Sequence, residues 1–410
     1  MLIGSACTRG AAAPSPIVIG AIYPISGAQG MGGTDEFDGV LLAEQMVNAA
    51  GGVNGHQIQV RPLDVAGSDA AAAAVEQLHT DGVQVVLGSY GSTISGPAST
   101  ATAARGMLFW ETGAVGMIPA AAAKGKLTFR VPPTGATLGR SAIDFVTKEL
   151  APRLHRAPHT LRFAVSYVDD VYGRSVAAGA TGELTSLGLR NVGSFGYDFR
   201  TADMNTLARK IAHVKPDVLF VSAYLQDGIA LRRALVSQHV PLLANIGTSS
   251  SYCMPQFGDT LGADAVGLFA SDKPSGWSLD PVGLSPDAAA LLKEADEEYE
   301  KQHGGYMSAP ALAGFSGAWA LFTQVMPAAT DASPRAISAA ARAVDLPMGS
   351  LPNGSGLRFG APGTQMAGDN IEAGSVIWQW IAPGKAAIVW PPQLATHPIE
   401  TLNIDPWTSG

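Results

Sequence analysis

Short apolar runs alternate along the chain with longer segments in which apolar residues recur at helical spacing. The apolar run at 17–23 is followed by a glycine-rich stretch and then by Phe37, Val40 and Val47, which lie on one helical face. The alternation continues as far as the apolar run at 241–247. Strands separated by such helices form right-handed βαβ units in a parallel sheet. Because one doubly wound sheet rarely holds so many strands, we predict an α/β fold with two lobes.

The last third of the chain has a different pattern. Helices are predicted over 285–304 and 309–329, and two strands joined by a short turn are predicted over 375–391. The apolar segment from Ala311 to Met326 contains polar residues and is shorter than the about 20 apolar residues that a membrane span needs. We therefore predict that it is a buried core helix.

Composition excludes several classes of protein. The 410 residues carry a net charge of −8 and no long Lys/Arg run, which argues against nucleic-acid binding by phosphate neutralisation. The two cysteines, Cys7 and Cys253, are too few for a disulfide scaffold, and no His/Cys cluster has zinc spacing. We expect no metal, no cofactor and no disulfide.

The first residues, MLIGSAC, resemble the end of a bacterial lipoprotein signal, in which the cysteine becomes the acylated N-terminus. Ser5 and Ala6 suit the cleavage site, whereas Gly4 stands where a leucine is usual. A basic n-region is absent and the apolar stretch is short, so the alternative is an incidental cysteine on a tail. We predict that Cys7 is lipidated and that the following residues are a tether.

The glycine-rich stretch at 26–33, SGAQGMGG, raises the question of phosphate binding. A P-loop needs a lysine, and no Lys or Arg occurs from 17 to 60. The dinucleotide pattern fails because Gly30 and Gly32 fit but Asp35 takes the third position. A glycine-rich loop after the first strand still marks the sheet edge at which ligands bind in open α/β folds.

The segment from 17 to 60 resembles the start of type I periplasmic solute-binding proteins of ABC importers, in the branched-chain amino acid and amide group. The stretches GSYGSTISGPAS, YVDDVYGRS and KPDVLFVSAYLQDGIALRRAL, and the closing GSVIWQWIAPGKAAIVWP, agree in order and spacing. The resemblance runs from Ile17 to Leu394. It implies two Rossmann-like lobes with parallel sheets, joined by three crossing strands, with the ligand buried in the cleft between them.

The resemblance also implies how the chain is divided. The expected units are a signal remnant and tether at 1–16, an N-terminal lobe of 17–132 plus 268–346, a C-terminal lobe of 133–267 plus 375–394, a hinge-crossing segment at 347–374, and a tail at 395–410.

Ligand contacts in the first lobe are assigned through the same resemblance. The hydroxyls of Ser92 and Thr93, with amides at a helix N-terminus, suit a carboxylate or carbonyl group; an ordinary helix cap is the alternative for Ser92. Gly113 and Ala114 match backbone contacts of the family. Val115 stands where the family has a threonine, so two neighbours are added as candidates, namely Thr112 as its substitute and Glu111, for which a solvated or hinge-paired carboxylate is the alternative.

In the second lobe, Tyr172 and Tyr224 match tyrosines that close onto the ligand, unless they only pack at the sheet edge. Ser249 occupies the place of the glutamate that pairs with an amino-acid ammonium in the family. A serine cannot neutralise that charge, so Asp227 or Glu111 would replace it, or the ligand lacks an ammonium. Gly32 matches an aromatic position of leucine binders and leaves room for a larger ligand.

The resemblance implies a non-enzymatic protein that binds an amino acid, amide or small carboxylate and delivers it to the permease and ATPase subunits of an ABC importer. We expect an extracytoplasmic monomer, lipid-anchored or periplasmic. The alternative is a ligand-sensing receptor module of the same fold. An enzyme is disfavoured because the chain has no G-x-S-x-G elbow, and Asp169–Asp170 reads as a helix cap.

Overall fold

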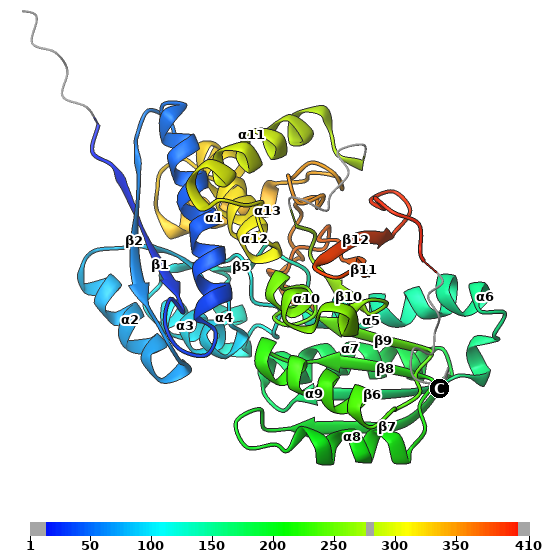
Figure 1. Cartoon of the computed structure of the whole chain (residues 1–410). Coiled ribbons are helices and arrows are strands. Elements are labelled where there is room, and N and C mark those ends of the chain that lie inside the picture. Colours follow the sequence, from blue (N-terminus) through cyan, green and yellow to red (C-terminus); the bar gives the residue numbers. More distant parts are fainter. Residues whose placement is uncertain (1–13, 276–282, 401–410) are drawn as a thin grey trace, which may run out of the picture.

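The computed structural model of the protein describes residues 14–275 and 283–400, which form two α/β lobes (Figure 1). Each lobe is built on its own sheet, one of five strands and the other of seven. The two separate sheets confirm the predicted two-lobed α/β fold. Cys7 lies outside the described residues.

The sheet of the first lobe is parallel throughout, in the order β2-β1-β3-β4-β5. Its strands are β1 (Ile17–Tyr23), β2 (Ile58–Asp64), β3 (Val85–Gly88), β4 (Leu108–Glu111) and β5 (Thr128–Arg130). The helices that alternate with them are α1 (Gly30–Ala49), α2 (Ser68–Thr80), α3 (Ser92–Ala104) and α4 (Ala120–Gly125). Each residue of β3 and β4 is buried. Helices cover both faces of such a sheet, which is why its strands appear as continuous apolar runs.

Three later helices, α11 (Pro286–His303), α12 (Ala309–Trp319) and α13 (Pro334–Ala343), complete this lobe. α12 packs against α1 (Figure 1), and glycines allow a close approach: a Cβ at Gly39 would lie 2.0 Å from the carbonyl oxygen of Ala311. α12 continues as a π-helical segment, Ala320–Val325. Residues 309–318 are all buried, which confirms the predicted core helix. Among the described residues, no helix has the length and apolar character to cross a membrane.

The sheet of the second lobe has the order β12-β11-β10-β9-β8-β6-β7. Its strands are β6 (Arg162–Val168), β7 (Arg190–Tyr197), β8 (Val218–Ser222), β9 (Ala244–Thr248), β10 (Phe269–Asp272), β11 (Val376–Ala382) and β12 (Lys385–Trp390). Its helices are α5 (Gly135–Phe145), α6 (Ala151–Arg153), α7 (Val171–Ser186), α8 (Met204–His213), α9 (Leu225–Ser237) and α10 (Pro255–Leu261). The pairs β10–β11 and β11–β12 are antiparallel, and the remaining pairs are parallel.

One predicted boundary differs from the structure. We predicted that the chain returns to the first lobe at 268, but β10 hydrogen-bonds in parallel to β9 and antiparallel to β11. The strand therefore belongs to the second sheet, where it satisfies the backbone groups along the edge of β9. The helices of the first lobe resume with α11.

Connections between the lobes run from β5 to α5, from β10 to α11 and from α13 to β11. Two of them meet at Asn370, whose side-chain amide donates to the carbonyl oxygens of Val131 (3.0 Å) and Gly356 (2.9 Å). Beside it, Arg130 forms a buried ion pair with Asp369 at 3.2 Å. These contacts fix the first and last connections to each other.

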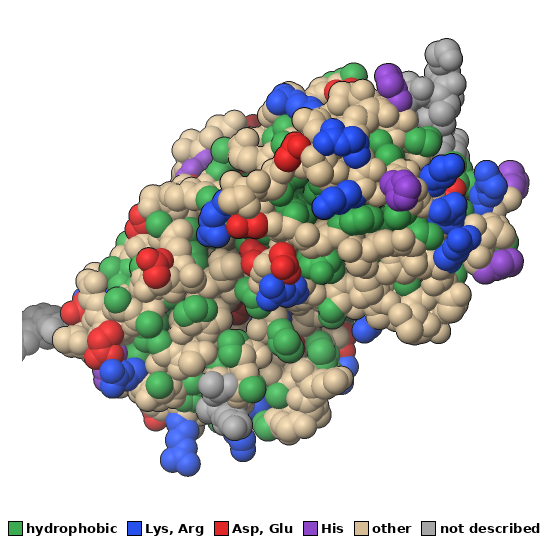
Figure 2. Space-filling view, turned by 90° about the horizontal axis from the view of Figure 1, so that it is seen from below, with side chains coloured by type: hydrophobic (Ala, Val, Ile, Leu, Met, Phe, Trp, Pro, Cys, Tyr) green, Lys and Arg blue, Asp and Glu red, His purple; other side chains and the backbone are tan. Residues whose placement is uncertain are grey.

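The face of the molecule shown in Figure 2 carries acidic and basic side chains interspersed with hydrophobic ones, and a group of Lys, Arg and His lies at one end. The charge on this face is therefore mixed in sign.

Candidate ligand-binding site

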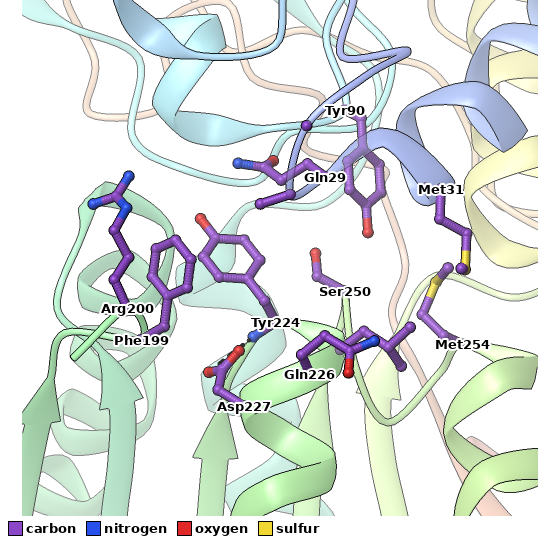
Figure 3. Close-up of a pocket in the computed structure, with 14 residues that line it drawn as sticks. Gln29, Met31, Tyr90, Phe199, Arg200, Tyr224, Gln226, Asp227, Ser250 and Met254 are labelled. Carbon is purple, nitrogen blue, oxygen red and sulfur yellow. Dashed lines mark hydrogen bonds between the residues drawn. The ribbon is translucent and has the colours of Figure 1, made fainter. Parts of the chain in front are cut away.

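A cavity of about 470 Å³ lies between the two lobes, within the range of roughly 300–1,000 Å³ that is usual for small-molecule sites. It is lined from both sides by loops that follow the carboxyl ends of strands, which is where ligands bind in open α/β sheets (Figure 3). The lining residues are Gly27, Ala28, Gln29, Met31, Gly32, Tyr90, Phe199, Arg200, Tyr224, Leu225, Gln226, Asp227, Ser250 and Met254.

The first-lobe wall is built by the glycine-rich stretch at 27–32, which ends in the first turn of α1, and by Tyr90, which follows β3. Gly32 lies against the Tyr90 ring so closely that a Cβ would be 2.3 Å from Cζ. The Tyr90 hydroxyl points toward Ser250 of the second lobe in Figure 3, and burial raises the pKa of this phenol. A tyrosine of the first lobe thus faces the second-lobe wall, and the glycine makes room for its ring.

Gln29 lines the cavity, whereas the predicted contact Thr93 does not. The side-chain amide of Gln29 donates to the Thr93 hydroxyl at 3.2 Å. The side-chain oxygen of Gln29 is buried without a hydrogen-bond partner among the described residues. Gln29 therefore stands in the cavity wall where we expected Thr93.

The second-lobe wall is aromatic. The Tyr224 ring lies 5.6 Å from Tyr172 and 5.0 Å from Phe199, centroid to centroid, the latter in an edge-on arrangement. The Tyr224 hydroxyl donates to the Asp170 carboxylate at 2.6 Å, which fixes the ring. Its oxygen can accept a hydrogen bond from a ligand, but its proton is already used.

The other two predicted contacts of the second lobe, Tyr172 and Ser249, do not line the cavity. The Tyr172 hydroxyl donates to the backbone carbonyl of Ser249 at 2.6 Å and is buried, so it supports the loop after β9. The Ser249 side chain is likewise buried. Its neighbour Ser250 lines the cavity instead.

Asp227 lines the cavity at the start of α9. Its Oδ2 accepts hydrogen bonds from the Tyr197 hydroxyl (2.6 Å) and the backbone N–H of Tyr224 (3.3 Å), and it lies below Tyr224 in Figure 3. Burial raises the pKa of this carboxyl to about 6, against the lowering effect of the Tyr197 hydrogen bond. The group is thus engaged in capping α9.

Arg200 is the exposed cation of the lining. It sits in the turn between β7 and α8, with its guanidinium 4.7 Å from the centre of the Phe199 ring. The turn is fixed by the Asp198 carboxylate, which accepts from the backbone N–H of Arg200 at 3.0 Å. Figure 3 shows the side chain extending from the second lobe toward the first-lobe side of the cavity.

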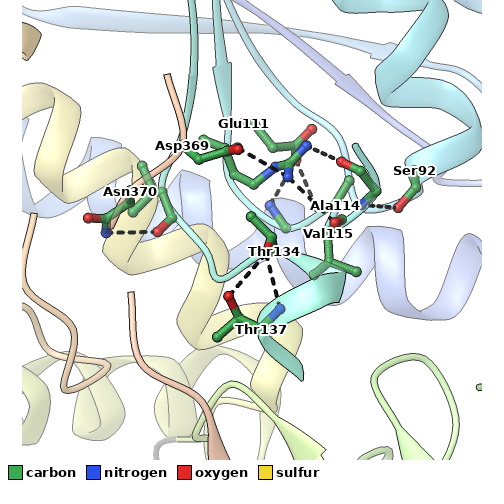
Figure 4. Close-up of polar contacts among 12 residues, drawn as sticks. Ser92, Glu111, Ala114, Val115, Thr134, Thr137, Asp369 and Asn370 are labelled. Atoms are coloured by element: carbon green, nitrogen blue, oxygen red, sulfur yellow. Dashed lines mark hydrogen bonds and ion pairs between the residues drawn. The ribbon is translucent and has the colours of Figure 1, made fainter. Parts of the chain in front are cut away.

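Other predicted residues of the first lobe lie away from this cavity. The Ser92 hydroxyl accepts from the backbone N–H of Gly116 at 2.9 Å. The Thr112 hydroxyl lies between the Tyr23 hydroxyl (2.5 Å) and the Glu36 carboxylate (2.7 Å). Ser92 lines a separate space of only about 10 Å³ (Figure 4).

Glu111 hydrogen-bonds to the backbone amides of Gly113 and Ala114, which we had predicted to bind the ligand. Its Oε1 accepts from the backbone N–H groups of Gly113 (2.9 Å) and Ala114 (2.7 Å). The residue is buried, and burial, with the nearby Glu36, raises the pKa of its carboxyl, while the charge of Arg130 lowers it. A carboxyl oxygen of the protein itself thus lies where we expected the ligand's carboxylate.

Of the predicted contacts, Gly32, Tyr224 and Asp227 line the cavity. Sequence reasoning missed several lining residues, namely Gln29, Met31, Tyr90, Phe199, Arg200, Gln226, Ser250 and Met254. The signal that could have found most of them is position directly after a strand. Whether the remaining predicted residues contact a ligand stays a prediction.

Two α/β lobes around a cavity define a bilobal ligand-binding protein. The chain matches the family model described as periplasmic binding protein over residues 16–372 and belongs to this family. It is 29% identical over 389 residues to the Leu/Ile/Val-binding protein homolog 8 of Brucella abortus, covering 94% of this chain and 93% of that protein.

Solved structures show the same fold. A leucine binding protein, LivK, from Thermotoga maritima aligns with a TM-score of 0.75 and 16% identity, covering 91% of this chain and 97% of that one. The branched-chain amino acid transporter substrate binding protein LivJ from Streptococcus pneumoniae, in complex with isoleucine, aligns with a TM-score of 0.72 and 18% identity, covering 92% and 100%. These matches confirm the type I periplasmic binding protein fold that the sequence resemblance implied.

Proposed function

We propose that this protein captures a small organic ligand in the interlobe cavity and delivers it to an ABC importer outside the cytoplasm. The observation that supports the proposal is a cavity of about 470 Å³ lined by both lobes, because a ligand bound there contacts both and favours their closed arrangement. The ligand is an amino acid, amide or small carboxylate. Relatives named as Leu/Ile/Val-binding proteins support this range.

The proposed location is the outer face of the cytoplasmic membrane or the periplasm, with Cys7 as the lipid-bearing residue. The partners are the small ligand and the permease and ATPase subunits, and the protein acts as a monomer without catalysing a reaction. Membership of the periplasmic binding protein family supports these assignments.

A binding screen followed by an uptake assay tests the proposal. Purified protein is screened by thermal shift against amino acids, amides and carboxylates, and hits are titrated by calorimetry. We expect one ligand per chain and weaker binding in Tyr224→Ala, with no change in the control Tyr306→Ala, whose ring is 60% exposed. Cells that lack the protein should lose uptake of the labelled ligand. Unchanged uptake, with ligand binding intact, would favour a sensory role and contradict import.

A further inference from the structure

In the described part of the chain, one cationic side chain lines the cavity, that of Arg200. Arg200 is exposed, and among the described residues no carboxylate or carbonyl pairs with its guanidinium. Asp198 accepts from its backbone N–H rather than from its side chain. A guanidinium offers a planar fork of donors that matches a carboxylate with two parallel hydrogen bonds.

The acidic groups near the cavity are engaged within the protein. The Oδ2 of Asp227 accepts from the Tyr197 hydroxyl and a backbone amide, while its Oδ1 is buried and has no hydrogen-bond partner among the described residues. Asp170 accepts from the Tyr224 hydroxyl and from the backbone N–H of Gly173 at 3.0 Å. A ligand ammonium would therefore find a counter-charge only by reaching the buried Oδ1 of Asp227 or by displacing an existing contact, and an unpaired ammonium is costly to bury.

The first lobe does not offer a free anion site in the predicted place. The amides of Gly113 and Ala114 bind Glu111, and the Ser92 hydroxyl binds the Gly116 amide. A ligand carboxylate placed there would have to displace the Glu111 side chain from these amides. A free ligand carboxylate would have to compete with a group that the chain itself holds against these amides.

The body of the cavity is suited to a flat apolar group. Tyr90 enters from the first lobe, and Tyr224 and Phe199 enter from the second. Met31 and Met254 lie together on the far side from Arg200 in Figure 3. Aromatic rings contribute large contact areas in offset or edge-on arrangements, and methionines adapt to the shape of what they contact.

We infer that the ligand is an organic monocarboxylate with a planar apolar body and no required ammonium group, and that its carboxylate pairs with Arg200 of the second lobe. The inference rests on the proposed function and narrows it to one substrate class. The ligand's anionic end then points toward the second lobe, whereas the sequence led us to expect it at the first-lobe amides.

Matched probes and variants test this inference. Calorimetry compares benzoate with benzamide and phenylpyruvate with phenylalanine, using wild type, Arg200→Gln and Arg200→Lys. The control is Arg209→Gln, an exposed arginine of α8 that hydrogen-bonds Thr206 and does not line the cavity. Loss of a charge-assisted pair corresponds to about a ten- to hundredfold loss of affinity.

We expect the carboxylates to bind, the amide and the zwitterion to bind at least tenfold more weakly, and Arg200→Gln to remove the difference between benzoate and benzamide. Arg200→Lys should retain part of the preference, because it keeps the charge but not the fork. Tight binding of phenylalanine or leucine that Arg200→Gln leaves unchanged would overturn the inference and leave the proposed function standing. If none of the four probes binds wild type or either variant at millimolar concentration, the inference is overturned. If the amino acids, amides and carboxylates of the wider screen also fail, the proposed function fails too.

Discussion

Glu36 is a buried carboxyl whose titration should be visible in the stability of the protein. It lies on α1 and is 0% exposed. One oxygen accepts from the Thr112 hydroxyl at 2.7 Å, and the other has no hydrogen-bond partner among the described residues. Burial raises the pKa of this carboxyl from 4.5 to about 7, although the Lys273 charge and the Thr112 hydrogen bond lower it, and Asp272 raises it further.

The sign and size of the effect follow from linkage. Between pH 4.5 and about 7 the folded protein holds a proton on Glu36 that the unfolded chain has released. The stabilisation is complete below pH 4.5 and is lost as the pH rises through about 7. At about 1.4 kcal/mol per unit of pKa difference, the total loss is about 3 kcal/mol. Glu36→Gln removes the titrating group and keeps an oxygen that can accept from Thr112.

Urea denaturation of wild type and Glu36→Gln, followed by tryptophan fluorescence from pH 4.5 to 8, measures this difference. The free energy of unfolding of the variant minus that of wild type should rise by about 3 kcal/mol across this range and then level off. Buried carboxyls that are not coupled to Glu36 titrate alike in both proteins and cancel, whereas the pKa of Glu111, which Glu36 raises, should fall in the variant. The control Glu294→Gln, on the exposed part of α11, should show a constant difference. Parallel pH profiles for wild type and Glu36→Gln would refute the reasoning.

Two further predictions concern the cavity wall and the N-terminus. Gly32→Ala places a Cβ 2.3 Å from the Tyr90 ring, so the ring must move and the ligand affinity measured by calorimetry should fall by about tenfold or more. The control Gly182→Ala, with open space around it, should bind the ligand as wild type does. Equal affinities of Gly32→Ala and wild type would show that the position of Tyr90 does not matter. Cys7→Ser, expressed from the natural precursor in a bacterium, should move the protein from the membrane fraction to the soluble fraction, because one acylated residue supplies the proposed anchor; identical fractionation would make Cys7 incidental.

The fold was predictable because its physical signals are local and repeated. Strands such as β3 and β4 are buried on both faces, so they appear as uninterrupted apolar runs between helical segments. The sheet to which β10 belongs was not predictable in the same way. Its four residues are all buried, which does not indicate a sheet, and only the tertiary pairing with β9 and β11 decides it.

The place of the cavity was partly predictable, but the side chains that face it were less so. The glycine-rich loop after β1 and the starts of helices after β8 mark the correct edge of both sheets. After β3, however, Tyr90 faces the cavity and Ser92, two residues later, turns to Gly116. Side-chain direction in a loop has no fixed period, so spacing cannot distinguish these residues. Arg200 occurs in an ordinary polar turn, and only the fold brings it beside Phe199 and the first lobe.

Glu111 shows why a local contact can replace an expected ligand contact. Its carboxylate is only two and three residues from the amides of Gly113 and Ala114, and the chain itself holds them together. A group tethered in this way has an effective concentration in the millimolar range or above, which a free ligand must exceed or outbind. The glutamate at the end of β4 therefore competes with any carboxylate for those amides. This competition is the physical reason to look for the ligand's anionic end at Arg200, on the opposite wall.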